Sequence, residues 1–333
     1  MMHSATGHRI SGLATLIAVA FTMPAGAQEQ EPTFRARTNV VTVPVLVRDE
    51  HGQAVYGLQA SDFLVQDDGV TQPVLLDQAV ESEPISLVIA LQTGRRALRE
   101  FPRMKGLGAM LEPIFAQPES RVALVEFDSA VNLTQNFSHD SAGVTRALQR
   151  LEPGDGGAAI LDAVQFCVRL LEDSPQRHRR VLLLISETRD HGSQTANIEK
   201  VVADVGNSSV VVYALPFSPS WSQVLDTERG SNKDEWGGSP NLLAPLMMAS
   251  QSLRRNTPRA IAGMTGGEYE LFSSRKNFER MVTEFTNHLH SRYLLSFEPK
   301  DPYPGLHTIR VQLKDAGKRS VLARSSYWAE GTR

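Results

Sequence analysis

The sequence predicts an α/β protein with a doubly wound, mostly parallel sheet, flanked by β-strands from both ends of the chain that form a small β-sandwich. Two observations lead to this fold class. Between residues 84 and 291, continuous apolar runs alternate with helical patterns, which is typical of a parallel sheet covered on both faces. At 28–80 and 292–330 the pattern is that of short strands and turns. Neither flank has enough strands to close a core alone, so we expect the two flanks to pair with each other.

The individual elements follow from apolar spacing. The strands expected in the central sheet are short apolar segments at 85–91, 121–127, 180–186 and 209–215, with a weaker one at 267–272 and an antiparallel edge strand at 132–138. The helices expected between them lie at 97–115, 141–151, 159–172, 195–205, 258–264 and 277–290. Flanking strands are expected at 40–47, 63–66, 73–77, 292–299, 307–313 and 320–328.

Residues 216–257 do not fit this alternation. They are rich in Ser, Gly, Pro and Asn and are too long for an ordinary connection, so we interpret them as an insertion in the α/β domain. Because the segment leaves the carboxyl end of the 209–215 strand, we expect it at the edge where open α/β sheets bind ligands. Its Trp221 and Trp236 either anchor a partner or pack the loop onto the domain.

Composition narrows the function classes. The 333-residue chain has 34 Lys and Arg against 37 Asp and Glu, a net charge of −3, which gives no excess positive field to hold a nucleic-acid backbone. We therefore expect no nucleic-acid partner. Cys167 is the only cysteine, which excludes an internal disulfide and any multi-thiolate metal site within one chain. Because it stands in the helical pattern LDAVQFCVRLLED, we expect a packed core thiol and not a nucleophile.

Residues 1–27 carry the pattern of a secretory signal peptide. Arg9 precedes an apolar stretch over 10–23, and the small residues of 25–27 follow it. The stretch is interrupted by polar residues and is shorter than the ~20 apolar residues that a spanning helix needs. We expect cleavage before Gln28, no membrane span in the mature chain, and a periplasmic or extracellular location.

The motifs of the α/β region occur in a recognisable order. They are ISLVIAL followed by QTGRR, then GDGGAAILDAV, RVLLLISETRDHGS and MTGGEYELF. This series resembles a von Willebrand factor A (VWFA) domain, which has a Rossmann-like fold. The flanks are VVTVPVLVRDEHGQAVYGLQASDFLVQDDG and HLHSRYLLSFEPKDPYPGLHTIRVQL. They are similar to those of the exported VWFA-related proteins of Acidobacteria. The resemblance covers nearly the whole mature chain and implies a fold, but no defined reaction.

The resemblance also implies a metal-ion-dependent adhesion site, formed by an Asp-x-Ser-x-Ser loop, a Thr on a second loop and an Asp on a third. At these positions the chain has Gln92, Gly94, Arg96, Ala158 and Glu187. Only Glu187 keeps a carboxylate, whereas Mg²⁺ needs a set of oxygen ligands. We therefore expect a degenerate, metal-free site and no cofactor.

Two arginines follow the first strand, and two interpretations of them remain open. Arg95 or Arg96 either replaces the cation by pairing with a nearby carboxylate, or is solvated on an exposed loop. The candidate partner-binding residues of these loops are Arg95, Arg96, Asp128, Asp155, Glu187 and Asp190, together with Trp221 and Trp236 of the insertion.

The sequence thus predicts an exported, non-enzymatic protein-interaction module of the adhesion type, which binds a protein partner without metal. Two alternatives remain open. One is Mg²⁺-dependent ligand binding at the same loops, and the other is an exported hydrolase that uses the acidic and histidine residues between Glu187 and Ser193. We expect no catalytic residues, because Asp190, His191 and Ser193 are neighbours on one loop, and such side chains usually diverge.

Overall fold

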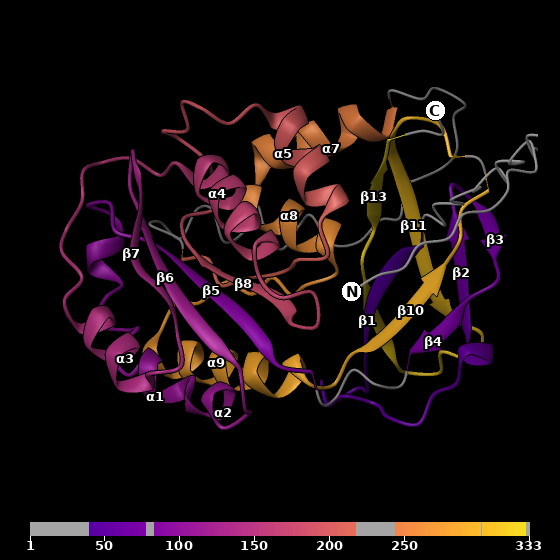
Figure 1. Ribbon diagram of the computed structural model, residues 1–333, viewed down its shortest axis with the longest axis horizontal. Helices are drawn as coiled ribbons and strands as arrows, with labels where there is room; N and C mark the ends of the chain where they lie inside the picture. Colours follow the sequence, from indigo (N-terminus) through magenta and orange to yellow (C-terminus); the bar gives the residue numbers. More distant parts are fainter. Residues whose placement is uncertain (1–39, 78–82, 218–243, 301, 331–333) are drawn as a thin grey trace, which may run out of the picture. The chain divides into compact units, whose positions relative to one another are not determined.

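The structure, a computed structural model, describes residues 40–77, 83–217, 244–300 and 302–330 (Figure 1). The predicted fold class is confirmed, since a five-stranded, mostly parallel sheet is accompanied by two four-stranded antiparallel sheets. The predicted signal peptide, Trp221 and Trp236 lie outside the described residues. None of the helices in the described ranges is long and apolar enough to cross a membrane.

The central sheet has the order β7-β6-β5-β8-β9. Strand β5 (Ile85–Gln92) lies in the middle, and each of its residues is buried. Its parallel neighbours are β6 (Arg121–Phe127) and β8 (Arg179–Ile185), and β8 pairs in parallel with β9 (Val211–Ala214). The edge strand β7 (Val131–Ser138) is antiparallel to β6, as predicted. Because the carboxyl ends of the parallel strands share one edge, the loops that follow β5, β6 and β8 are brought together there.

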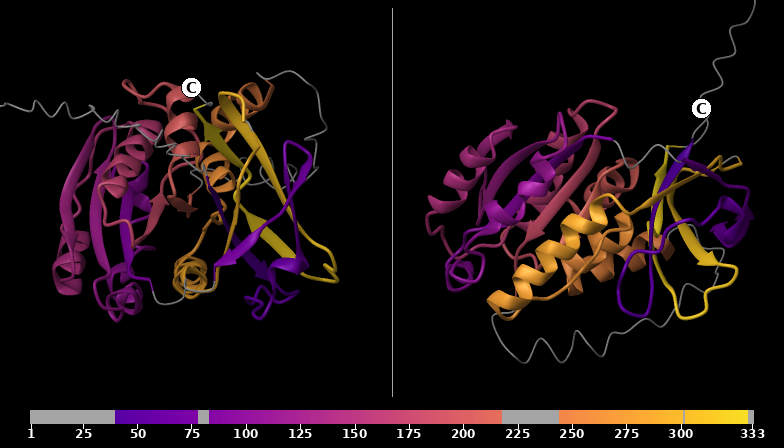
Figure 2. Two further views of the ribbon diagram at one scale, coloured as in Figure 1. Left: turned by 45° about the vertical axis from the view of Figure 1, so that its right-hand side comes forward. Right: turned by 90° about the horizontal axis from the view of Figure 1, so that it is seen from below.

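Helices cover both faces of this sheet, which buries the central strand β5 along its whole length (Figures 1 and 2). One face is covered by α1 (Leu107–Met110), α2 (Glu112–Phe115), α3 (Ser141–Gln149) and α9 (Arg275–Leu289). The other is covered by α4 (Ile160–Glu172), α5 (Ile198–Asn207), α7 (Ala244–Arg255) and α8 (Thr257–Thr265).

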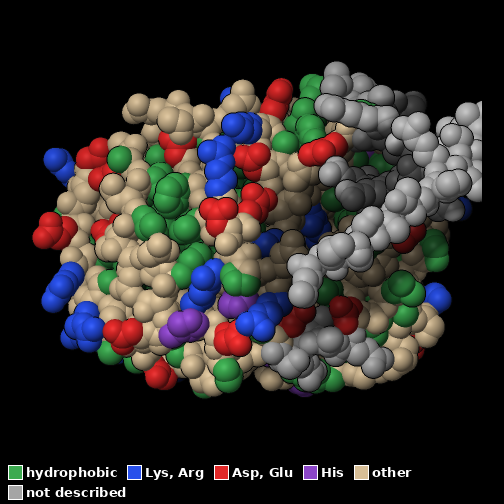
Figure 3. All heavy atoms as spheres, in the orientation of Figure 1, with side chains coloured by type: hydrophobic (Ala, Val, Ile, Leu, Met, Phe, Trp, Pro, Cys, Tyr) green, Lys and Arg blue, Asp and Glu red, His purple; other side chains and the backbone are tan. Residues whose placement is uncertain are grey.

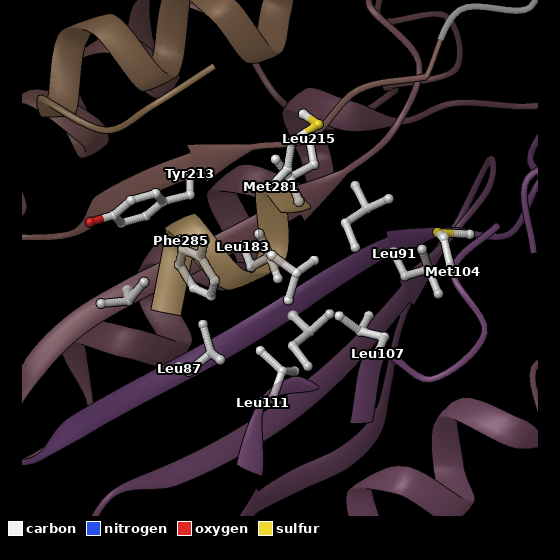
Figure 4. Close-up of a cluster of buried hydrophobic side chains, with 14 of the residues drawn as sticks. Leu87, Leu91, Met104, Leu107, Leu111, Leu183, Tyr213, Leu215, Met281 and Phe285 are labelled. Carbon is white, nitrogen blue, oxygen red and sulfur yellow. The ribbon is translucent and has the colours of Figure 1, made fainter. Parts of the chain in front are cut away.

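Alternation along β5 divides its side chains between two cores. Leu87 and Leu91 pack with Phe285 of α9 and other apolar side chains on the first face (Figure 4), whereas Val88 and Ala90 enter the core on the other. Cys167 of α4 lies in that second core and is fully buried, so burial raises the pKa of its thiol, as expected for a packed thiol.

The flanking segments pair with each other. Strand β1 pairs with β10 and β2 pairs with β11, both antiparallel, so each sheet of the sandwich contains strands from both flanks. One sheet has the order β12 (Ser320–Ala323), β1 (Val41–Arg48), β10 (Tyr293–Phe297) and β4 (Leu75–Asp77). The other has the order β13 (Ser326–Ala329), β11 (Gly305–Leu313), β2 (Phe63–Asp67) and β3 (Val70–Gln72).

The prediction of a single long helix at 97–115 is wrong. The segment contains a 3-10 turn, η3 (Ala97–Arg99), followed by the separate short helices α1 and α2. Gly106 interrupts it with a φ of 93°, a left-handed conformation that glycine adopts readily. Pro113 lies in the first turn of α2, where its missing N–H removes no helical hydrogen bond.

Three other segments also differ from the predicted secondary structure. The expected strand at 267–272 forms only isolated parallel bridges, of Tyr269 with Ala214 and of Phe272 with Phe217. Part of the predicted insertion 216–257 is helix α7, whose weak apolar pattern buries only Ala249 and Leu253. The expected strand at 320–328 is divided into β12 and β13.

A buried histidine ties the turn between β2 and β3 to β11. His307 Nδ1 lies 2.8 Å from Asp68 Oδ2, and Nε2 donates to the Tyr303 carbonyl oxygen at 2.7 Å. The ring lies between those of Tyr303 and Tyr327, with centroid distances of 4.0 and 4.9 Å. Both ring nitrogens therefore face acceptors, as in an imidazolium. Although Asp67, Asp68 and His307 bring possible metal ligands within 4.8 Å of one another, a doubly protonated ring has no lone pair for a metal.

This contact predicts a pH dependence of stability. Burial alone would lower the pKa of His307, but the hydrogen bonds with Asp68 and Tyr303 and the two nearby carboxylates outweigh it and raise the pKa. A raised folded-state pKa stabilises the protein below the unfolded pKa of about 6.5, and this contribution is lost as pH rises through the folded value.

We therefore expect the difference in unfolding free energy between wild type and His307→Gln to shrink as the pH rises from about 6 to about 9. Urea unfolding at each pH measures it. A difference that stays constant over that interval contradicts the assignment of an imidazolium.

Candidate functional site

The loops at the carboxyl edge of the sheet are joined through their backbones. Thr93 N–H donates to the Phe127 carbonyl at 2.8 Å, which connects the loops after β5 and β6. Gly154 N–H donates to the Thr93 carbonyl at 2.8 Å, and Ala158 exchanges two hydrogen bonds with His191. The first, second and third loops of the predicted adhesion site therefore meet, as the fold requires.

At the centre, Gln92 and Glu187 bind each other reciprocally. Glu187 N–H donates to Gln92 Oε1 at 2.8 Å, and Gln92 Nε2 donates to Glu187 Oε1 at 3.2 Å. The second carboxylate oxygen, Oε2, lies 3.1 Å from His191 Nε2 and 3.4 Å from Arg96 Nη1. Glu187 is only 4% exposed. Since a buried carboxylate is costly unless it is paired and hydrogen-bonded, these protein donors are what stabilise it there.

The two arginines after β5 differ in their contacts. Arg96 forms an ion pair with Glu187, while its own side chain is 61% exposed, so the guanidinium reaches from the buried carboxylate to solvent. Such a pair is worth about 0–1 kcal/mol. Arg95 is exposed, and its backbone N–H donates to the Asp155 carbonyl at 2.7 Å. Of the two arginines, Arg96 is thus the one that meets a carboxylate of the degenerate site.

Asp128 and Asp155 hold neighbouring loops in shape. Asp128 Oδ2 accepts from Asp155 N–H at 2.9 Å, and Asp128 Oδ1 accepts from Ala130 N–H at 2.9 Å. Asp155 Oδ1 accepts from Gly157 N–H at 2.7 Å and from Ser129 N–H at 3.1 Å. The Gly157 and Ser129 hydrogen bonds hold the pKa of the exposed Asp155 below its usual range. Its carboxylate therefore stays charged at the surface.

Asp190 and Ser193 cap the start of α4. Asp190 Oδ1 accepts from Leu161 N–H at 2.9 Å and from Ser193 Oγ at 2.5 Å, and Ser193 Oγ accepts from Asp162 N–H at 3.1 Å. Among the described residues, no hydrogen bond joins Ser193 to His191, whose Nε2 faces Glu187. The three residue types of a catalytic triad are thus present, but their side chains do not converge. Asp190 and Ser193 bind the start of a helix, and His191 binds a buried carboxylate.

The residues at the five ligand positions do not fit a hard divalent cation. Gln92 uses its carbonyl oxygen to bind Glu187 N–H, and Ala158 offers no side-chain oxygen. A Cβ at Gly94 would lie 2.5 Å from the Gly157 carbonyl oxygen, so a serine there requires the loop to move. The departure from an Asp-x-Ser-x-Ser loop is therefore built into the backbone as well as the side chains.

The contact of His191 with Glu187 could not be predicted from the sequence. His191 follows Glu187 by four residues on an irregular loop, where sequence spacing does not tell in which direction a side chain points. The bridge between Ala158 and His191 places it, and that bridge joins residues far apart in the chain.

A family comparison agrees with this geometry. Residues 91–189 match the von Willebrand factor type A domain. The match runs from the end of β5 to the loop after β8, so it includes the positions of the degenerate site. The α/β region thus has a VWFA-type fold. The narrower resemblance to Acidobacterial proteins stays a prediction.

Several solved structures are similar to the chain. The conserved hypothetical protein BatB of Bacteroides thetaiotaomicron is 14% identical, with 60% of this chain and 98% of that one covered and a TM-score of 0.40. An aerotolerance-related membrane protein of Bacteroides fragilis is 15% identical, with 61% and 99% covered and a TM-score of 0.38. Proximal thread matrix protein 1 of the mussel byssus, solved with a zinc-occupied MIDAS motif, is 13% identical, with 72% and 50% covered and a TM-score of 0.44. A comparison with curated protein sequences gives no match.

The reciprocal pair predicts unequal effects of two substitutions. Gln92→Leu leaves Glu187 N–H and a carboxylate oxygen buried without partners, so we expect a loss of about 1–3 kcal/mol in unfolding free energy. Arg96→Gln removes only a half-solvated pair, and we expect a loss of at most about 1 kcal/mol. Urea unfolding of both variants tests this, and equal losses contradict the central role of Gln92.

Proposed function

We propose that the protein is an exported, non-enzymatic protein-interaction module of the adhesion type, whose carboxyl-edge loops bind a protein partner without a metal ion. The observation that carries this proposal is the closed network around Glu187. Its carboxylate is satisfied by Gln92, Arg96 and His191, so the edge presents an arginine where the fold would otherwise present a coordinated cation.

The surface available to a partner is polar and carries both signs of charge. Arg95, Arg96 and Asp155 are exposed on adjoining loops, whereas Glu187 is buried beneath them. Figure 3 shows basic and acidic side chains interspersed over the face in view. A partner would then be recognised through a pattern of complementary charges, which sets specificity and association rate more than affinity.

Export is proposed from the signal-peptide pattern of residues 1–27. The exported location would bring the module to envelope or extracellular partners. Trp221 and Trp236 remain candidates for additional partner contacts, since tryptophan is enriched among residues that dominate binding energy.

The metal-free part of the proposal predicts that neither Mg²⁺ nor Mn²⁺ raises the thermal midpoint of the protein. A ligand that binds only the native state must stabilise it. Differential scanning calorimetry with each cation, and with chelator as the reference, measures this. A saturable rise that Glu187→Gln abolishes would instead support metal-dependent ligand binding.

The location of the binding surface is tested by charge reversal. We expect Arg96→Glu and Asp155→Lys to weaken binding to a partner captured from an envelope extract by about tenfold or more, with capture unchanged by chelator. Arg146→Glu, on α3, is the matched control, because Arg146 is exposed and pairs only with Asp140 among the described residues. Equal binding by all three variants contradicts the proposed surface.

A further inference from the structure

A small cavity lies at the opposite end of the central strands from the site above. Its volume is about 180 Å³, and it is bordered by the amino ends of β8 and β9 and by residues of β1 and β10 in the sandwich. Arg179 is the first residue of β8, whereas Glu187 follows the last, so the length of a strand separates the two sites. Neither the match to the family model nor the degenerate adhesion site accounts for this cavity.

The lining is strongly basic. Four arginines contribute to it, namely Arg179, Arg180, Arg292 and Arg324. Glu83 is the one acidic residue among the described residues that line it. Four arginines against one glutamate give the lining a formal charge above +2 even when His178 is neutral. Such a charge is unusual in a partly enclosed space, because burying like charges together is unfavourable.

Two of the four arginines, Arg324 and Arg180, are bound mainly by acceptors of the protein itself. Arg324 donates to the carbonyl oxygens of Gly206, Ser208 and Ser326, and the first two lie at the C-terminal end of α5, where the helix dipole favours a cation. Burial lowers its pKa to about 10, so it remains charged at neutral pH. Arg324 thus connects the sandwich to α5. Arg180 donates from Nη1 to Ser209 Oγ at 3.0 Å and from Nη2 to the carbonyl oxygens of Glu172 and Ser174 at 3.3 Å, which leaves Arg179 and Arg292 to explain.

Each of those two has a buried donor without a hydrogen-bond acceptor in the described part of the chain. The atoms are Arg179 Nη1 and Arg292 Nη2. Arg292 Nη2 lies 3.5 Å from Glu268 Oε1, close enough for an ion pair but without a hydrogen bond. Leaving a buried donor unsatisfied costs about 1–3 kcal/mol, and more for a charged group. Two such donors, on arginines that line one cavity, point to an acceptor that binds there.

The donors are held in place by rigid neighbours. Arg292, whose side chain is 1% exposed, donates from Nε to Tyr213 Oη at 2.7 Å and from Nη1 to the Gly266 carbonyl at 2.5 Å. Figure 4 shows the Tyr213 ring at one end of the apolar cluster, with its hydroxyl pointing away from it. Arg179 and Arg292 both line the cavity, and burial lowers the pKa of Arg179.

We propose that this cavity binds a small tetrahedral oxyanion, either inorganic or as the phosphate or sulfate group of a small molecule. Guanidinium groups present planar forks of N–H donors that suit such oxygens. A tetrahedral anion can accept from several directions at once, which matches arginines on different elements, Arg179 on β8 and Arg292 before β10, better than a planar carboxylate does. A dianion also offsets the excess charge of the lining.

Isothermal titration calorimetry with inorganic phosphate tests the proposal, with sulfate and acetate as parallel ligands at equal ionic strength. We expect saturable one-site binding of phosphate or sulfate and weaker binding of acetate. Arg179→Met should weaken phosphate binding by about tenfold or more, a change of about 1.4 kcal/mol. The matched control is Arg146→Gln, which removes an exposed arginine from α3 and should leave binding unchanged.

A second measurement separates a ligand-binding role from a structural one. If Arg179 serves to bind an anion, Arg179→Met removes a buried charge that the phosphate-free protein does not need. We then expect this variant, without phosphate, to be at least as stable in urea as wild type. We also expect it to lose the stabilisation that phosphate gives to wild type. No saturable binding of phosphate or sulfate to wild type overturns the proposal. Stronger binding of acetate, or equal phosphate binding by Arg179→Met, overturns it as well.

Discussion

The reciprocal bond between Gln92 and Glu187 is the contact on which the carboxyl edge depends. A carboxylate that is 4% exposed is costly unless it is paired and hydrogen-bonded. Here the amide of Gln92, the guanidinium of Arg96 and the ring of His191 supply the partners. In the proposed function, these protein donors take the place of a cation, and the exposed charges around them recognise the partner.

The two ends of the central sheet differ in whether their buried charged groups have partners. At the carboxyl edge, each charged group that is buried has a partner of opposite sign or a hydrogen bond. In the cavity beside the amino ends of β8 and β9, Arg179 and Arg292 each keep a buried donor that has no acceptor among the described residues. Natural proteins rarely leave such groups unsatisfied, because the desolvation cost is not recovered. The second site thus resembles a binding site that is incomplete without its anion, whereas the first is complete in itself.

The architecture of the chain could be predicted because burial on two faces leaves a continuous apolar pattern. Strand β6 was predicted at its observed bounds, and the pairing of the two flanks followed from the small number of strands in each. The break at Gly106, the bridges at 267–272 and helix α7 were missed. These features do not change the spacing of apolar residues along the sequence. They are a left-handed backbone conformation, a close approach of two backbones at Val212 and a helix that buries only two residues.

By itself, the sequence determined the fold class and the residue types that stand in the loops at the carboxyl edge, since these depend on residue type and local spacing. Only the tertiary structure decided which of Arg95 and Arg96 meets Glu187, that His191 joins them, and that arginines from separate elements surround one cavity. The physical reason is that charge and hydrogen bonding act through space over a few ångströms. Chain positions far apart in sequence reach that range only when strands and loops are packed against each other.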